Sequence, residues 1–213
     1  MRSSVCFKIP MKILLTGFDP FGGEKINPSY EAVKKVRPPE GTELIRLEVP
    51  TVFGRSVEVT TEKIKEFRPD AVICVGQAGG RNAVTPERVA INLMDAGIPD
   101  NEGRMPVDEA IVPGGENALF STLPVKKITT AIQKAGIPAR LSNTAGTFVC
   151  NQLLYGVLHF CREHCPETKA CFIHLPYLPE QTEKKPEMPS LPLDRMAAAL
   201  EAAIICIADN RNV

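Results

Sequence analysis

The sequence predicts a single α/β domain in which a mostly parallel, mixed sheet is sandwiched between helices, a three-layer α/β/α arrangement. Short apolar runs alternate along the chain with longer stretches in which apolar residues recur at helical spacing. Strands of a parallel sheet are covered on both faces and therefore appear as continuous apolar runs. With 213 residues, 44% of them apolar, the chain is long enough to enclose one substantial core.

Apolar runs bounded by turn residues predict strands at residues 12–18, 43–49, 71–76, 88–93, 139–142 and 170–175. Amphipathic periodicity predicts helices at residues 29–36, 56–67, 124–135, 150–163 and 193–208. The segment from Asp95 to Glu116 is rich in Gly, Pro and Asp, and loops of that length are more often functional than idle. The proline-rich stretch 176–192 is expected to be a surface excursion before the last helix.

Charge and cysteine content restrict the partners and the compartment. Lys plus Arg equals Asp plus Glu at 25 each, without runs of like charge, so we expect neither a nucleic-acid nor a membrane partner. The apolar stretch near the C-terminus contains Glu201 and is too short to cross a bilayer. Seven cysteines without an export signal indicate free thiols in a cytoplasmic protein. Residues 1–10 lack the apolar run of a signal peptide, and we expect an N-terminal extension to a catalytic domain at 11–213.

Cys150 is the strongest candidate for a nucleophile. It stands where a loop of small residues, 142–148, runs into the apolar periodicity of a helix. Unpaired N–H groups and the positive end of the helix dipole favour thiolate over thiol in a first helical turn. His174, at the end of a predicted strand, and Glu87, before another, supply a base and a group to orient it. The competing interpretation of Cys150 is a small buried apolar residue.

Two alternative interpretations concern the same residues. Cys161, Cys165, Cys171 and His174 have some likeness to a structural zinc site. In a strand, however, Cys171 and His174 are an odd number of residues apart and point to opposite faces. Glu87, by itself, would more often form a solvated pair with the arginine that follows it.

Several segments follow predicted strands and are expected to converge, because ligands meet a parallel sheet at the carboxyl ends of its strands. They are residues 17–23, residues 76–81, the loop before Cys150, and His174. Phe18 and Phe21 in the first segment suit either an apolar pocket wall for a neutral ligand or simple core packing.

Motifs along nearly the whole chain together resemble the pyroglutamyl peptidase I family of cysteine peptidases, also called pyrrolidone-carboxylate peptidases. The resemblance extends from Met11 to about Asn210. The motifs that carry it are GFDPFGG at 17–23, VPTVF at 49–53, GQAGGR at 76–81, TPERVAIN at 85–92, IPDNEG at 98–103, TAGTFVCN at 144–151 and FIHLPY at 172–177.

The resemblance implies a catalytic triad of Cys150, His174 and Glu87, the roles that their chemistry also indicates. It further implies that a lactam ring is held between aromatic and polar residues, namely Phe18, Phe21, Asn27, Gln77, Phe148 and Val149. Family members similar to this chain often carry Arg immediately before the IPDNEG motif, where it is proposed to help hold the oxyanion; this chain has Gly97 there.

The activity implied is removal of an N-terminal pyroglutamyl residue from small peptides through a thioester, by a homotetramer that requires no metal and no organic cofactor. A non-catalytic lactam- or peptide-binding domain, or a zinc-stabilised one, would use some of the same residues and is the alternative.

Overall fold

The computed structural model describes residues 10–210, and its central element is a five-stranded sheet in the order β2, β1, β3, β7, β4. β1 pairs in parallel with both β2 and β3, and β3 pairs in parallel with β7, whereas β4 is antiparallel to β7. The strands are β1 (Met11–Phe18), β2 (Thr42–Val49), β3 (Ala71–Gln77), β4 (Thr85–Glu87) and β7 (Lys169–Leu175).

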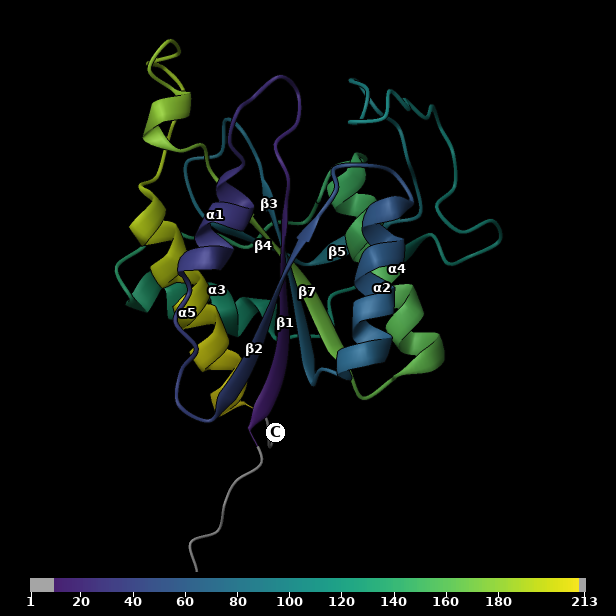
Figure 1. Cartoon of the computed structure of the whole chain (residues 1–213), viewed down its shortest axis with the longest axis horizontal. Helices are drawn as coiled ribbons and strands as arrows, with labels where there is room; N and C mark the ends of the chain where they lie inside the picture. Colours follow the sequence, from purple (N-terminus) through teal and green to yellow (C-terminus); the bar gives the residue numbers. More distant parts are fainter. Residues whose placement is uncertain (1–9, 211–213) are drawn as a thin grey trace, which may run out of the picture.

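Helices cover both faces of this sheet, which confirms the predicted three layers (Figure 1). One face carries α1 (Pro28–Lys35), α3 (Val125–Lys134) and α5 (Leu193–Asp209). The other carries α2 (Arg55–Phe67) and α4 (Val149–His164). These bounds agree with the predicted helices to within one residue at each end, because each helix has a clear apolar stripe.

Alternate residues of the central strands belong to two different cores. In β7, Cys171 and Ile173 pack with α1, α3 and α5, whereas Ala170 and Phe172 pack with α2 and α4. β3 alternates in the same way, with Ile73 on the first face. Since side chains alternate across a strand, His174 lies on the face of Phe172, toward α4.

The strand expected at 88–93 is present but shorter, at residues 89–91, and it does not belong to the main sheet. Residues 85–87 form β4 at the edge of the main sheet, and β5 (Val89–Ile91) instead pairs antiparallel with β6 (Ala118–Phe120) in a separate two-stranded sheet. Arg88, between β4 and β5, is exposed and marks the place where the chain leaves the main sheet.

The expected strand at 139–142 is also wrong, since this segment forms only isolated parallel bridges, Val84 with Ala139 and Glu87 with Ser142. Backbone bonds connect the two segments on either side of Pro86. Proline has no N–H, so the ladder bond that Pro86 would donate is missing and the pairing is interrupted.

The remaining expectations concern the loops and the ends of the chain. Most of the segment 95–116 is without regular structure and extends outward beyond α2 and α4 (Figure 1). The excursion at 176–192 contains one short 3-10 helix, Pro179–Gln181. Residues 1–9 of the expected extension lie outside the described residues. Within the described part of the chain, no helix combines the length and apolarity needed to cross a membrane.

Candidate active site

A row of three positions crosses the carboxyl end of the sheet on the face that α4 covers. Gly76 of β3 is paired with His174 of β7, and Gly17 of β1 is paired with Val75, so Phe18 comes alongside Gly76. Side chains at neighbouring positions of parallel strands point to the same face, and the strands are about 4.8 Å apart. The glycine therefore leaves a gap between the phenyl ring of Phe18 and the imidazole of His174.

The thiol of Cys150 occupies this gap. A Cβ atom added to Gly76 would lie 3.0 Å from the Cys150 Sγ and 2.7 Å from Cζ of Phe172. Cys150 is the second residue of α4, and it keeps part of its surface in contact with solvent. The sulfur thus lies over the strand position next to His174, about one strand spacing from the residue that bears the imidazole.

The imidazole of His174 is held by a buried carboxylate. Its Nδ1 lies 2.7 Å from Oε1 of Glu87, and the Glu87 side chain is completely buried. Glu87 of β4 lies opposite Phe172 of the antiparallel strand β7. Its side chain therefore reaches diagonally to His174, two residues further along β7 on the same face. A carboxylate can only accept, so Nδ1 carries the proton of neutral His174 and Nε2 has the free lone pair.

The ionisation of Glu87 depends on these partners. Burial by itself raises the pKa of the Glu87 carboxyl, but the hydrogen bond and charge of His174, the Ser142 hydroxyl and the charge of Arg81 outweigh burial and lower it. Glu87 is therefore an anion in the neutral range. The expectation of a solvated pair with Arg88 does not hold, because Arg88 is exposed while Glu87 is buried.

The thiol itself behaves differently from the sequence-based expectation. Burial, reinforced by the negative charge of Glu87, raises the pKa of Cys150 to about 12, although the charge of Arg81 and the backbone N–H of Cys150 lower it. Burial likewise lowers the pKa of His174 below its usual 6.5, against the effect of Glu87. Burial therefore favours a neutral thiol and a neutral imidazole in the free site, in contrast to the thiolate that the helix N-terminus alone led us to expect.

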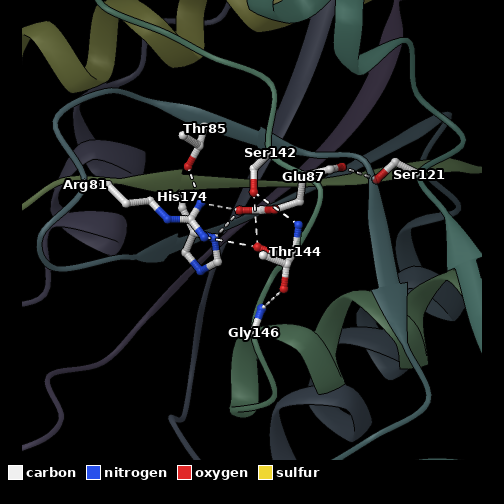
Figure 2. Close-up of polar contacts among 8 residues, drawn as sticks. All are labelled: Arg81, Thr85, Glu87, Ser121, Ser142, Thr144, Gly146 and His174. Atoms are coloured by element: carbon white, nitrogen blue, oxygen red, sulfur yellow. Dashed lines mark hydrogen bonds and ion pairs between the residues drawn. The ribbon is translucent and has the colours of Figure 1, made fainter.

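Arg81 connects the segments that carry the site (Figure 2). Its Nη1 lies 2.5 Å from Oε1 of Glu87 and 2.5 Å from Oγ1 of Thr85, and its Nη2 donates to the carbonyl of Thr144 at 3.1 Å. Thr144 belongs to the loop that leads to Cys150. Three of the four segments expected to converge at the sheet edge are thus linked through Arg81 and Glu87, and the fourth, residues 17–23, contacts the loop before Cys150 through the rings of Phe21 and Phe148.

The aromatic residues expected around a ligand divide into two groups. Phe18 is buried in the core against Phe172, with ring centroids 6.4 Å apart, and Val149 is completely buried. Phe148, the N-cap of α4, is only half-buried and contacts Phe21 at 6.0 Å and Phe53 at 5.3 Å between centroids. The partly open apolar surface near the start of α4 therefore consists of Phe21 and Phe148, supported from the core by Phe53, which sequence reasoning did not single out.

The two amide side chains of the expected pocket already have protein partners. Asn27 caps α1, since its Oδ1 accepts from the N–H and the hydroxyl of Ser29 while its Nδ2 donates to the carbonyl of Asp19. Gln77 accepts at Oε1 from Nε2 of Gln181, at 2.9 Å. Because Gln181 uses its own oxygen for the N–H of Leu178, the amide orientations are settled and the NH₂ group of Gln77 faces away from Gln181.

A polar network, which sequence reasoning also missed, ties the loops around the aromatic residues together. Asp19 Oδ1 accepts from the N–H and hydroxyl of Thr51 and from the amide of Asn101. The buried carboxylate of Asp100 accepts from the N–H of Phe53 at 2.9 Å. All of these residues lie within the motifs quoted above, but only the folded chain shows that they bond to one another.

The geometry does not favour a zinc site at Cys171 and His174. Cys171 packs into the core formed with α1, α3 and α5, whereas His174 stacks near Phe172 on the opposite face, with ring centroids 4.6 Å apart. Within residues 10–210, no group of three or more His, Cys, Asp or Glu side chains is placed to share a metal ion.

An imidazole held by a buried carboxylate, with a thiol at the start of the adjacent helix, is the arrangement of a cysteine hydrolase. Comparison with known proteins gives the particular family. A model of the pyroglutamyl peptidase family matches residues 11–210, and the chain belongs to this family.

Individual relatives agree with that assignment. Pyrrolidone-carboxylate peptidases of Streptococcus pyogenes are 54% identical over 200 residues, which cover 93% of this chain and 93% of those proteins. The crystal structure of pyroglutamyl peptidase I from Bacillus amyloliquefaciens is 53% identical with a TM-score of 0.91, covering 93% of this chain and 95% of that one. A mutant pyrrolidone carboxyl peptidase from the hyperthermophile Pyrococcus furiosus is 42% identical with a TM-score of 0.88, covering 94% and 99%.

The gap at Gly76 can be tested by filling it. In Gly76→Ala, the new methyl group must displace the buried Phe172 ring and the Cys150 sulfur, so we expect a loss of about 1–3 kcal/mol in the free energy of unfolding and slower alkylation of Cys150 by iodoacetamide. Urea unfolding and mass spectrometry of the alkylated residue measure the two effects. Gly97→Ala is the control, since no atom lies within 4 Å of its added Cβ. Wild-type stability and alkylation in Gly76→Ala would contradict the placement of the sulfur.

Proposed function

We propose that this chain removes N-terminal pyroglutamyl residues from peptides, with Cys150 as nucleophile, His174 as general base and acid, and Glu87 as the group that orients His174. Membership of the pyroglutamyl peptidase family supports the activity. The observation that carries the residue roles is the bond of 2.7 Å between Nδ1 of His174 and Glu87, beside a sulfur packed over the neighbouring Gly76.

The chemistry of the substrate matches the surroundings of Cys150. Pyroglutamate has no charged amine and presents a flat lactam ring with one donor and one acceptor. The half-buried rings of Phe21 and Phe148, with the buried ring of Phe53 packed against Phe148, provide an apolar surface for such a ring, and the free NH₂ of Gln77 is a donor for a lactam carbonyl. Unblocked Glu or Gln would bring an ammonium group that nothing in this surface compensates, so the site discriminates against them. Asn27 acts by holding Asp19 and the start of α1 in place. Phe18 and Val149 are buried in the core beneath this surface.

The neutral thiol and imidazole define how the attack proceeds. Nε2 of His174 takes the proton of Cys150 as the sulfur attacks the carbonyl that follows the ring, and the resulting imidazolium donates this proton to the departing amine. A thioester forms. Water, deprotonated by His174, then releases pyroglutamate and restores the thiol. The anionic Glu87 keeps the proton on Nδ1 and stabilises the imidazolium in both steps.

The oxyanion is proposed to be held by the backbone at the start of α4. The N-cap is Phe148, whose side chain offers no acceptor, so the N–H groups of the first turn have no capping side chain. A backbone donor of this kind contributes about 3 kcal/mol to a transition state. Gly97 supplies no side chain, and Arg81 is committed to Glu87, Thr85 and Thr144.

The residue roles are tested by release of a chromogenic amine from a pyroglutamyl substrate. Cys150→Ser and His174→Ala are each expected to lower kcat/KM by on the order of 10⁴-fold or more, because either change removes the proton transfer. Cys206→Ser and His159→Ala, in α5 and on the far part of α4, are matched controls that retain activity.

Turnover that persists in Cys150→Ser or His174→Ala would contradict the mechanism. Absence of turnover in the wild type, combined with calorimetric binding of pyroglutamate, would instead indicate a non-catalytic binding protein. Loss of fold and activity in a chelator would indicate a structural metal.

The pKa values of the pair predict a broad pH profile. The active form has one proton, on the thiol; it is lost at low pH when His174 is protonated and at high pH when Cys150 ionises. Because burial lowers the pKa of His174 and raises that of Cys150 to about 12, kcat/KM should stay flat from below pH 6.5 to above pH 9.0, the usual pKa values of the two groups. The measurement is kcat/KM against pH, with circular dichroism to verify the fold. An acid limb above pH 6.5 would contradict a neutral resting pair.

We further propose a cytoplasmic homotetramer. The cysteines in the described part of the chain are free thiols, which suits a reducing compartment. The loop 95–116 exposes Ile98, Met105 and Val107, at 46%, 52% and 67%, and neighbouring exposed apolar side chains are typical of association surfaces.

Sedimentation equilibrium is expected to give four times the chain mass, and Val107→Asp in the exposed loop should shift the protein to smaller species without loss of secondary structure. A wild-type monomer at micromolar concentration would contradict the tetramer.

A further inference from the structure

Arg81 lies in the turn after β3 and joins two segments that are otherwise far apart in the sequence. Its guanidinium bonds to Glu87 and Thr85 of β4, and to the carbonyl of Thr144 in the loop before α4 (Figure 2). Thr144 continues through a turn, in which its Oγ1 accepts from the N–H of Gly146, into Cys150. The same side chain thus contacts the group that orients His174 and the loop that carries the nucleophile.

The guanidinium shape suits this position. Arg presents several N–H donors in one rigid plane, so that one side chain can hold partners on different segments at fixed angles, which a single ammonium group cannot do. The Arg81 side chain is 21% exposed, so its bonds are largely shielded from water. Two of its bonds come from Nη1 and a third comes from Nη2.

Arg81 also determines the balance of charge around the reacting pair. Oε1 of Glu87 accepts from both Arg81 and His174, so the buried anion faces two partners at one oxygen. The titratable groups that act on Cys150 and His174 are Glu87 on β4, Arg81 in the turn and Cys74 on β3. Glu87 raises the pKa of both members of the pair, and the positive charge of Arg81 lowers the pKa of both.

We propose that Arg81 is a positioning residue for the hydrolysis, a guanidinium clamp that fixes Glu87 and the Thr144 loop in register and offsets the carboxylate charge felt by the thiol and imidazole. This inference rests on the proposed function of Cys150, His174 and Glu87. It assigns Arg81 no contact with the substrate, because the three bonds of its guanidinium go to the protein. Without the clamp, Glu87 would keep only the neutral imidazole of His174 as a partner within its ion-pair contacts, in a fully buried position.

Two variants separate the charge of Arg81 from its shape. Arg81→Met removes both, so we expect kcat/KM to fall about 10- to 100-fold, and the acid limb of the pH profile to move to higher pH as the uncompensated Glu87 raises the pKa of His174. Arg81→Lys keeps the charge but cannot hold the three partners together, so kcat should fall while the acid limb stays close to that of the wild type. Arg81→Lys also carries the test if Arg81→Met does not fold.

The control is Arg55→Met, which breaks an arginine–glutamate pair on the surface of α2, where both side chains are about 60% exposed. It should leave both the rate and the acid limb unchanged. The measurements are kcat and KM for a chromogenic pyroglutamyl substrate from acid to alkaline pH, with thermal unfolding of each variant recorded in parallel.

The outcomes distinguish this proposal from the one it rests on. Wild-type kcat/KM and acid limb in Arg81→Met, with Cys150→Ser inactive, would overturn the clamp and leave the catalytic residues intact. A lower kcat in Arg81→Met with the acid limb unmoved would also overturn it, because that is the result of direct contact with the transition state. Turnover in Cys150→Ser would reject the catalytic residues themselves, whatever the arginine variants show.

Discussion

The fully buried carboxylate of Glu87 is the group on which the arrangement of this site depends. A charge removed from water costs several kcal/mol unless the protein supplies close partners, and breaking such a pair is more destabilising than never forming it. Here the partners are His174 from the neighbouring strand and Arg81 from a turn. One electrostatic requirement thus connects β3, β4 and β7 at the edge of the sheet where the chemistry takes place.

The sheet contributes a steric constraint that is equally specific. In the row Phe18, Gly76 and His174, only the middle position lacks a side chain, and the sulfur of Cys150 enters from α4 to occupy that place. Packing in protein interiors is dense, and the place that a side chain at Gly76 would take is filled by the Cys150 sulfur together with the edge of the Phe172 ring. The proposed nucleophile and base are therefore placed on neighbouring positions by the register of two strands and the docking of one helix.

The ionisation of Cys150 shows two effects in competition. A helix N-terminus stabilises a negative charge by about 1 kcal/mol, and by about 2 in favourable geometry. Burial and the adjacent carboxylate act in the other direction and raise the pKa of the Cys150 thiol. In the proposed mechanism, the N-terminus of α4 serves as a set of N–H donors for the oxyanion. The positive charge of Arg81 offsets part of the negative charge of Glu87. It thereby limits how strongly the carboxylate opposes ionisation of Cys150.

The sequence by itself determined the layers, the five helices, four of the strands and the residues that carry reactive groups. Periodicity reports which face of an element is apolar, and a thiol, an imidazole or a carboxylate is visible in the residue type. The strand expected at 139–142 was predicted incorrectly, because Pro86 opposite it has no N–H to continue the ladder of backbone hydrogen bonds. A hydrophobic pattern contains no information about such bonds. The tertiary structure alone decided that Glu87, 87 residues from His174, is its partner, that Arg81 joins them, and that burial raises the pKa of the Cys150 thiol. These properties arise from burial and from distances between segments far apart in the chain, which exist only after folding.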